Sequence, residues 1–346
     1  MKTEIRIYKG AHVSHCNRDI LRKRTVMALS KLVLPVICAP MFIVSGLDLV
    51  KAACCEGIVG TFPALNARTT EALDRWLADV SSATCEGPQP VYGVNLIVHS
   101  SNPRLDADVD LCIKYKVPLI ITSLGIRRDV INRIQSYGGL VFHDATTVRH
   151  AQKGIDAGVD GLILICAGGG GHAGSLSPFA FIPEVRRIFE GCIVAGGAIS
   201  SGVSIAAARL LGADLTYIGT RLIATRESAA SDGYKQMILD GAASDVVYTP
   251  AITGVHGSFL KASLRAAGLT PDDLPEKPAS FHARRQDEST KQEGATAWKL
   301  IWSAGQGIGS IDDVPSLADL IVRMRGDFAT AIQSAGSSHR LQDMIL

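Results

Sequence analysis

The sequence lacks the features that mark secreted, membrane-spanning or nucleic-acid-binding proteins. Residues 1–6 have no apolar core of the kind found in signal peptides. The longest apolar run, residues 32–44, is interrupted by Pro35 and Pro40 and is too short to span a bilayer. The net charge is only +2, so nothing favours nucleic acid or a membrane as a partner. We therefore expect a cytoplasmic protein that acts on small molecules.

Cysteine patterns that hold metals or exchange disulfides are also missing. The eight cysteines include no C-x-x-C pair, which excludes a readable zinc ribbon or dithiol redox motif. His12, His15 and Cys16 have a ligand-like spacing, but no further ligand cluster accompanies them, so no metal site is predicted. Most cysteines lie in apolar contexts and are expected to be reduced, buried hydrophobes: Cys38, Cys112, Cys166 and Cys192.

What the chain does have, between about residues 33 and 225, is a regular alternation of short apolar runs and amphipathic stretches. Near-continuous apolar strands that alternate with helices indicate a parallel sheet covered on both faces. Eight such units predict an α/β fold, a (β/α)8 TIM barrel. Helices are expected at 144–157 and 201–211, among others. The expected strands are 36–39, 58–60, 91–96, 119–122, 140–143, 161–166, 192–196 and 215–219.

The alternation stops after Arg226. Residues 227–300 hold helical segments and a charged, proline-bearing stretch, without barrel-like strands. We expect a smaller, mostly helical second domain there, inserted before a C-terminal helix that begins near Val314 and packs on the barrel. The predicted domains are a barrel of residues 1–226 and 301–346 and a helical lid or substrate domain of residues 227–300.

A glycine run after the sixth strand is the most informative motif. Residues 166–174 read Cys-Ala-Gly-Gly-Gly-Gly-His-Ala-Gly. Four consecutive glycines cannot form a stable helix or strand, but they let backbone approach a flat or charged ligand. His172 stands at the end of this opening, where an imidazole can act as acid or base. The run satisfies G-x-G-x-x-G, but no helix follows it and no acidic residue ends the next strand, so a dinucleotide-binding fold is not predicted.

Other strand ends also carry glycine or polar side chains, and the functional groups of a barrel gather at the carboxyl ends of its strands. Gly196-Gly197 and Gly219-Thr220 each precede an expected helix start, where backbone N–H groups bind anions. The loops after strands seven and eight are also the usual phosphate site of barrels. The sequence therefore predicts a phosphorylated cofactor or substrate at these two loops.

These motifs and their order resemble the flavin-dependent nitronate monooxygenase (2-nitropropane dioxygenase) family. The resemblance extends over residues 39–306. Its motifs are Ala39-Pro40-Met41, Gly93-Val94-Asn95-Leu96, Gly170-Gly171-His172-Ala173-Gly174, Gly196-Gly197, Gly212-Ala213-Asp214, Gly219-Thr220-Arg221-Leu222 and Trp302-Ser303-Ala304-Gly305-Gln306.

The resemblance implies a TIM barrel that binds FMN and oxidises alkyl nitronates or nitroalkanes with O2 to a carbonyl compound and nitrite. His172 would be the general base, and the FMN phosphate would lie at the two loops named above. The residues expected to bind the cofactor are Ala39, Pro40, Met41, Asn95, Thr122, His143, Ala167, Gly168, Gly171, Gly196, Gly197, Gly219, Thr220, Ser303, Gly305 and Gln306.

Two positions depart from the family pattern. Many members carry Glu where Gly168 stands, and Gln or Lys commonly occupies the position of Asp144. A Lys or Gln could stabilise negative charge on the reduced flavin, whereas Asp144 would oppose that charge if it pointed inward. Asp144 could instead cap the following helix.

Three functions therefore stay open at this stage. The first is nitronate oxidation. The second is NAD(P)H-dependent flavin reduction of quinones or enoyl thioesters, and the third is a non-redox barrel that binds a phosphate ligand. The oligomeric state is also open, with a homodimer as one candidate.

Overall fold

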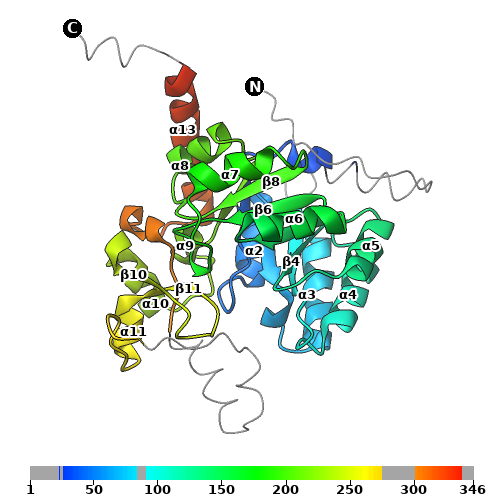
Figure 1. Ribbon diagram of the computed structural model, residues 1–346, viewed down its shortest axis with the longest axis horizontal. Coiled ribbons are helices and arrows are strands. Elements are labelled where there is room, and N and C mark those ends of the chain that lie inside the picture. Colours follow the sequence, from blue (N-terminus) through cyan, green and yellow to red (C-terminus); the bar gives the residue numbers. More distant parts are fainter. Residues whose placement is uncertain (1–22, 24–25, 84–90, 275–300, 337–346) are drawn as a thin grey trace.

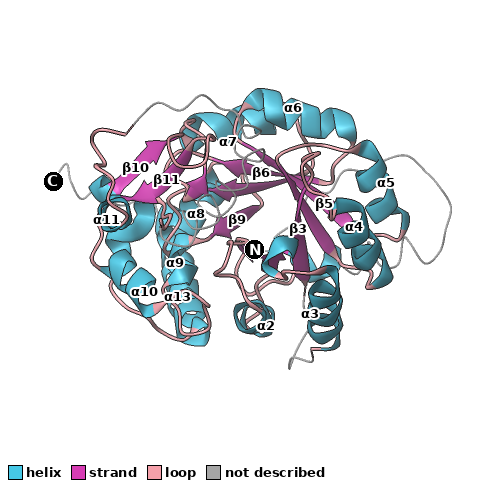
Figure 2. Ribbon diagram, turned by 90° about the horizontal axis from the view of Figure 1, so that it is seen from below, coloured by secondary structure: helices cyan, strands magenta, loops and turns pink. Residues whose placement is uncertain are grey.

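The fold is an eight-stranded parallel barrel surrounded by helices. The computed structural model describes residues 23, 26–83, 91–274 and 301–336. The main sheet has the strand order β1-β9-β8-β6-β5-β4-β3-β2, with parallel neighbours throughout. A parallel bridge between Ile37 and Val59 joins the two ends of this order and closes the barrel. Figure 2 shows the strands inside and the helices around them, which confirms the predicted (β/α)8 barrel.

The expected strands correspond to the observed ones, although β2 continues further along the chain because Phe62 and Pro63 pair with β3. The barrel strands are β1 (Val36–Cys38), β2 (Gly60–Pro63), β3 (Tyr92–Ile97), β4 (Leu119–Ser123), β5 (Leu140–Ala145), β6 (Gly161–Ile165), β8 (Cys192–Gly196) and β9 (Leu215–Ile218). The surrounding helices are α2 (Leu47–Cys55), α3 (Thr70–Ser82), α4 (Leu105–Lys114), α5 (Arg128–Ser136), α6 (Val148–Ala157), α7 (Pro178–Arg186) and α8 (Gly202–Leu210). Short helical turns are η1 (Ala64–Asn66), α9 (Thr220–Ile223) and η3 (Gln306–Ser310).

Both faces of the barrel strands are buried, which explains their near-continuous apolar sequence. Ile121 of β4 and Phe142 of β5 belong to the cluster that fills the barrel interior. Their neighbours Ile120 and Val141 point the other way, into the larger cluster between the sheet and its helices. This alternation fixes which residues at the strand ends can reach the barrel mouth.

Helix α6 shows how the chain leaves each strand and returns to the next. Its N-cap is Thr147, whose side chain accepts a hydrogen bond from the backbone N–H of His150 at 3.1 Å. The proposal that Asp144 caps this helix is therefore wrong, because β5 continues through Asp144 to Ala145. At the other end Gly158 adopts a left-handed φ of 83°, the expected glycine cap.

The expected C-terminal helix is α13 (Leu317–Gly336), drawn in red in Figure 1, and it packs on α8 and α2. Helix α13 approaches α8 so closely that the backbones of the two helices are in contact at Gly202. A Cβ atom added at Gly202 would lie only 2.1 Å from the carbonyl oxygen of Met324. Only glycine is therefore compatible with this helix contact.

The segment after the barrel strands differs from the expectation of a helical region without strands. Its described part, residues 227–274, is called the lid segment below and lies to the left of the barrel in Figure 1. It contains α10 (Asp232–Leu239), η2 (Ala243–Asp245) and α11 (Lys261–Ala266), but also the antiparallel strands β10 (Val246–Thr249) and β11 (Gly257–Leu260). The sequence Val-Val-Tyr-Thr of β10 favours a strand, since it is β-branched and aromatic.

The lid segment is joined to the glycine run through this small sheet. Strand β11 pairs with β7 (Gly171–His172), with Gly257 opposite His172. Residues 275–300, which hold most of the charged stretch, lie outside the described residues.

The cysteines divide by exposure. Cys38, Cys112, Cys166 and Cys192 are buried and free, as expected. Cys55 is disulfide-bonded, so the expectation of a fully reduced chain was wrong. Cys55 lies on the exposed side of α2, next to the buried Cys54.

Two features bear on metal and membrane binding. His12, His15 and Cys16 lie outside the described residues. The part of the chain that the structure describes holds no group of three or more His, Cys, Asp or Glu residues placed to bind a metal. Within the same residues, no helix combines the length and apolarity needed to cross a membrane.

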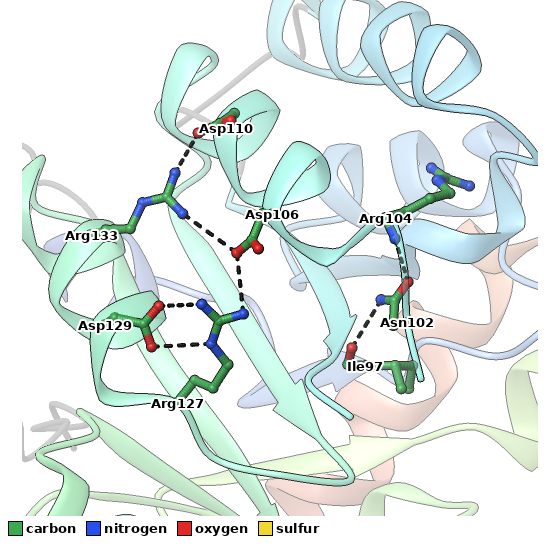
Figure 3. A network of polar contacts seen from close by, with 8 residues as sticks. All are labelled: Ile97, Asn102, Arg104, Asp106, Asp110, Arg127, Asp129 and Arg133. Atoms are coloured by element: carbon green, nitrogen blue, oxygen red, sulfur yellow. Dashed lines mark hydrogen bonds and ion pairs between the residues drawn. The ribbon is translucent and has the colours of Figure 1, made fainter. Parts of the chain in front are cut away.

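An ion-pair network ties α5 to α4 on the surface (Figure 3). Arg127 and Arg133 both approach Asp106, and they also pair with Asp129 and Asp110. All five side chains are at least one-third exposed, so each pair contributes little to stability. The network lies beside the loop between β3 and α4, which forms part of the cavity wall described next.

Candidate active site

A cavity of about 1350 Å³ opens at the carboxyl ends of the barrel strands. Cavities that bind one small molecule are usually about 300–1000 Å³. This one therefore has room for a cofactor and a substrate together. Its walls come from the loops that follow the barrel strands, from the lid segment and from residues 301–307.

The structure brings most of the expected site residues to this cavity. Three of them, Thr122, Ala167 and Gln306, are not among its lining residues. Those that line it are Ala39, Pro40, Met41, Asn95, His143, Gly168, Gly171, His172, Gly196, Gly197, Gly219, Thr220, Ser303 and Gly305.

Thr122 and His143 contact each other on the helix-facing side of the sheet. Thr122 Oγ1 lies 2.9 Å from His143 Nδ1, and both side chains are buried. Burial lowers the pKa of His143 to about 4, which keeps the imidazole neutral. Because side chains alternate along a strand, Ser123 and Asp144 face the barrel interior instead. The structure therefore turns the Thr122 side chain toward His143, away from the barrel interior, and a cofactor contact of Thr122 stays a prediction.

Backbone from several loops meets around the glycine run. The carbonyl oxygen of Gly168 accepts hydrogen bonds from the N–H groups of Ala198 at 3.2 Å and Gln306 at 2.9 Å. A Cβ atom at Gly305 would lie 2.5 Å from that same oxygen, and one at Gly170 would lie 2.8 Å from the Gly305 nitrogen. The loops can meet in this way only because these positions have no side chain. Gln306 joins these loops through its backbone N–H.

The departure at Gly168 has a conformational reason in this chain. Its φ is +83°, in the left-handed region that disfavours residues with a Cβ atom. A Cβ atom there would also lie 3.0 Å from the Cβ atom of Ala198. A glutamate at this position would require the loop to rearrange.

Two buried hydroxyl groups at the cavity fit the phosphate that the sequence predicts. Ser200 Oγ and Ser303 Oγ have no hydrogen-bond partner among the described residues, although both residues line the cavity. An unsatisfied buried polar group costs roughly 1–3 kcal/mol. Ser200 directly precedes Ser201, the N-cap of α8, where backbone N–H groups favour an anion. These hydroxyl groups are therefore placed to bind a phosphorylated ligand, and sequence reasoning did not single out Ser200.

His172 is oriented by the lid segment. Its Nε2 lies 3.2 Å from Thr253 Oγ1, and Thr253 Oγ1 lies 2.9 Å from the carbonyl oxygen of Val255. A hydroxyl group has one hydrogen, and the Val255 carbonyl can only accept it. The hydroxyl oxygen therefore accepts from Nε2–H, which assigns the proton of the neutral imidazole to Nε2 and its lone pair to Nδ1. Burial lowers the pKa of His172, so the neutral form predominates at pH 7.

Asp144 points into the barrel and ends a chain of polar side chains. Asn95 Nδ2 donates to Ser123 Oγ at 2.7 Å, and Ser123 Oγ donates to Asp144 Oδ2. The second carboxyl oxygen, Oδ1, is buried without a hydrogen-bond partner in the described part of the chain. Burial raises the pKa of Asp144 to about 7. The carboxyl group therefore exchanges a proton near neutral pH.

Thr253 and Tyr248 of the lid segment contact the residues of the candidate site, and the sequence did not reveal them. Tyr248 lines the cavity and donates a hydrogen bond from its hydroxyl to the carbonyl oxygen of Ala173 at 3.0 Å. Thr253 is 81 residues from its partner His172. The signal for β10 was present in its β-branched sequence, but nothing local indicated that its partner β11 pairs with the glycine run.

Comparison with known proteins supports the family resemblance that the sequence motifs indicated. The family model "Nitronate monooxygenase" matches residues 92–326. A monooxygenase of Mycobacterium tuberculosis is 28% identical over 245 residues, which cover 68% of this chain and 65% of that protein. A nitronate monooxygenase of Paraburkholderia phytofirmans is 28% identical over 59% of each chain. This chain therefore spans less than two-thirds of the length of either relative.

A third relative matches over nearly its whole length. It is the (3aS,4S,5R,7aS)-5-hydroxy-7a-methyl-1-oxo-octahydro-1H-indene-4-carboxyl-CoA dehydrogenase of Mycobacterium tuberculosis, which is 25% identical. The match covers 88% of this chain and 95% of that protein.

Solved structures support the barrel fold. FabK from Thermotoga maritima has a TM-score of 0.72 at 23% identity and covers 90% of this chain and 97% of its own. The nitroalkane oxidase from Streptomyces ansochromogenes has a TM-score of 0.73 at 24% identity and covers 89% and 99%, respectively.

Proposed function

The chain belongs to the nitronate monooxygenase family of flavin-dependent oxidoreductases, and from this premise we propose that it uses FMN to oxidise alkyl nitronates or nitroalkanes with O2 to a carbonyl compound and nitrite. The observation that carries this proposal is the position of His172. A half-buried, neutral imidazole lines the same cavity as the glycine loops and the hydroxyl groups of Ser200 and Ser303. One cavity thus combines a base with a place for a phosphorylated cofactor.

FMN would supply the electron-accepting ring system when bound. The residues present fit its two chemical parts. Ser200, Ser303 and the backbone of Gly196-Gly197 and Gly219-Thr220 would hold the phosphate. Met41 and the side-chain-free backbone of residues 168–171 would lie against the flat ring.

His172 would remove the proton from the carbon next to the nitro group. The C–H bond breaks, its electron pair forms the C=N bond of the nitronate, and the proton moves to Nδ1. General-base catalysis of this kind contributes roughly 10²–10⁴ in rate. Apolar cavity residues suit the alkyl part of such a substrate: Phe42, Ile43, Pro63 and Leu65.

We also propose that residues 227–300 form a lid over the cofactor, with residues 1–226 and 301–346 forming the barrel. Four residues of the lid segment line the cavity: Tyr234, Tyr248, Val255 and His256. Strand β11 pairs with the strand that carries His172. The lid would therefore both enclose the substrate and orient the base.

Substitution of Thr253 by valine tests the orientation of His172. Valine has nearly the volume of threonine but lacks the hydroxyl oxygen that accepts a hydrogen bond from Nε2–H. That hydrogen bond stabilises the protonated imidazole. A hydrogen bond of this kind contributes about 0.5–1.5 kcal/mol, so kcat/KM for a nitroalkane should fall roughly threefold to tenfold. The apparent pKa of His172 in the pH–rate profile should also move down. Thr253→Ser should restore both, and an unchanged profile in Thr253→Val would contradict this positioning role.

A second candidate function is the NAD(P)H-dependent reduction of an enoyl thioester of the acyl-CoA type. The cavity continues to the exposed side chains of Arg128 and Lys153, which could pair with phosphate groups. Arg104 also lines this side but is already paired with Asp108 at 2.9 Å. The nearly full-length similarity to a CoA-thioester dehydrogenase favours the same substrate class.

Product analysis separates the two candidates. FMN-loaded protein is incubated in air with ethyl nitronate, and nitrite formation and O2 consumption are followed together. The proposal expects nitrite to form as O2 is consumed, without NADH or NADPH. Absence of nitrite, together with NADPH oxidation that depends on an enoyl-CoA, would overturn the first candidate in favour of the second.

A further inference from the structure

One of the two carboxyl oxygens of Asp144 is buried and has no hydrogen-bond partner among the described residues. Asp144 lines the cavity at the carboxyl end of β5, and its Oδ1 is buried. None of the ion pairs found among the described residues involves it. A buried carboxylate without a cation is costly, so the group must either bind a proton or meet a ligand.

The groups that face Asp144 from the neighbouring strands carry no opposing charge. Strand β4 contributes Ser123 and β3 contributes Asn95, both uncharged. Strand β9 contributes Tyr217, whose pKa is raised well above its usual value by burial and further by Asp144. Two cations that line the cavity, Arg128 and Lys153, are exposed at its outer edge, and Arg128 donates a hydrogen bond to the carbonyl oxygen of Asp156 at 2.6 Å. His143, the neighbour of Asp144 on β5, bonds Thr122 on the opposite face of the sheet.

The hydrogen-bond directions identify which oxygen binds the proton. Asn95 donates to Ser123, so the Ser123 hydroxyl hydrogen is left to donate to Asp144 Oδ2. Oδ2 is therefore an acceptor in both protonation states. Oδ1 is the atom that gains or loses the proton, and burial places its pKa at about 7 in the free cavity.

We propose that Asp144 takes up a proton when the flavin in this cavity is reduced, so that an uncharged carboxyl group faces the negative charge gained by the ring. Two electrons come from the substrate or from an added reductant, one proton goes to the flavin and one proton from solvent goes to Asp144 Oδ1. A lysine or glutamine at this position would stabilise the negative charge of the reduced flavin with a permanent N–H group. Asp144 would instead do so by binding a proton. This inference rests on the flavin binding proposed above.

Linkage between flavin reduction and protonation fixes the pH range in which Asp144 takes up a proton. Negative charge on the reduced flavin favours the protonated carboxyl group, so the pKa of Asp144 is higher in the reduced protein than in the oxidised one. Below pH 7 the group is protonated in both states and takes up nothing. Above pH 7, up to the pKa of the reduced state, reduction adds one proton to Asp144.

The flavin midpoint potential measured against pH tests this proposal. FMN-loaded wild-type protein and Asp144→Asn are titrated anaerobically with a chemical reductant and a reference dye between pH 6 and pH 9. One additional proton changes the reduction equilibrium tenfold per pH unit, which is about 30 mV for a two-electron couple. Above pH 7 the wild-type potential should fall with pH more steeply than that of Asp144→Asn by this amount, and below pH 7 the two slopes should agree.

Two further variants make the result specific. Ser123→Ala removes the hydrogen bond that lowers the pKa of Asp144, so the steeper slope should begin at a higher pH. Asp156→Asn removes an exposed carboxylate from the cavity edge and should leave the wild-type profile unchanged. Equal slopes in wild type and Asp144→Asn, with FMN bound to both, would overturn the role of Asp144. Failure of the wild-type protein to bind FMN would overturn the proposed function itself.

Discussion

Substitution of His172 by asparagine is expected to lower the turnover of a neutral nitroalkane by roughly 10²–10⁴, the usual contribution of a general base. FMN binding should stay close to that of the wild type, because the proposed phosphate and ring contacts come from other side chains and from backbone, not from the imidazole. Turnover of the preformed nitronate should change far less, since its proton has already been removed. The split between the two substrates is the signature of proton abstraction by His172.

The measurement is kcat/KM for 2-nitropropane and for its nitronate with the same enzyme preparation. His150→Asn is the matched control, because His150 is an exposed imidazole at the edge of the same cavity and should be replaceable without effect. An equal loss on both substrates in His172→Asn would show that the residue positions the substrate instead of removing its proton.

Substitution of Gly305 by alanine should have the largest effect on cofactor binding. The new Cβ atom would lie 2.5 Å from the carbonyl oxygen of Gly168, so the glycine run and the 303–307 loop must move apart. Overpacking of this kind typically costs about 1–3 kcal/mol. If that cost falls on the bound state, FMN affinity decreases by roughly tenfold to 100-fold.

Fluorescence titration with FMN measures this change. Gly309→Ala is the control in the same loop region, because its nearest neighbour would be the Ala243 nitrogen at an ordinary 3.6 Å. It should bind FMN like the wild type. Equal affinities for Gly305→Ala and Gly309→Ala would mean that the loop contact does not shape the cofactor site.

The barrel could be predicted from sequence because its signals are local. Each strand is a short apolar run buried on both faces, and each helix between two strands is amphipathic. The caps at Thr147, Gly158 and Ser201 are likewise set by neighbouring residues. The eight strands of the barrel were therefore found in the right order with small errors at their ends.

The orientation of the Thr122 side chain could have been predicted from strand geometry. Thr122 and Ser123 are consecutive on β4, and His143 and Asp144 are consecutive on β5. Only one residue of each pair can face the barrel interior, because side chains alternate along a strand. The structure selects Ser123 and Asp144, which join Asn95 in one hydrogen-bonded chain.

Other parts of the site depend on contacts between distant segments and could not be predicted. The bond between His172 and Thr253 requires β11 to pair with the glycine run. The unpartnered hydroxyl groups of Ser200 and Ser303 become visible only when the loops that bury them are in place. The raised pKa of Asp144 likewise results from burial, which its sequence neighbours do not reveal.

The central claim is that this cavity holds a flavin that is reduced by a nitronate. Anaerobic mixing of FMN-loaded protein with ethyl nitronate, NADH or NADPH, while the visible absorbance band of the flavin is followed, tests it most directly. We expect the band to be lost with the nitronate and to stay unchanged with either pyridine nucleotide. Loss of the band with NADH or NADPH, and none with the nitronate, would contradict it.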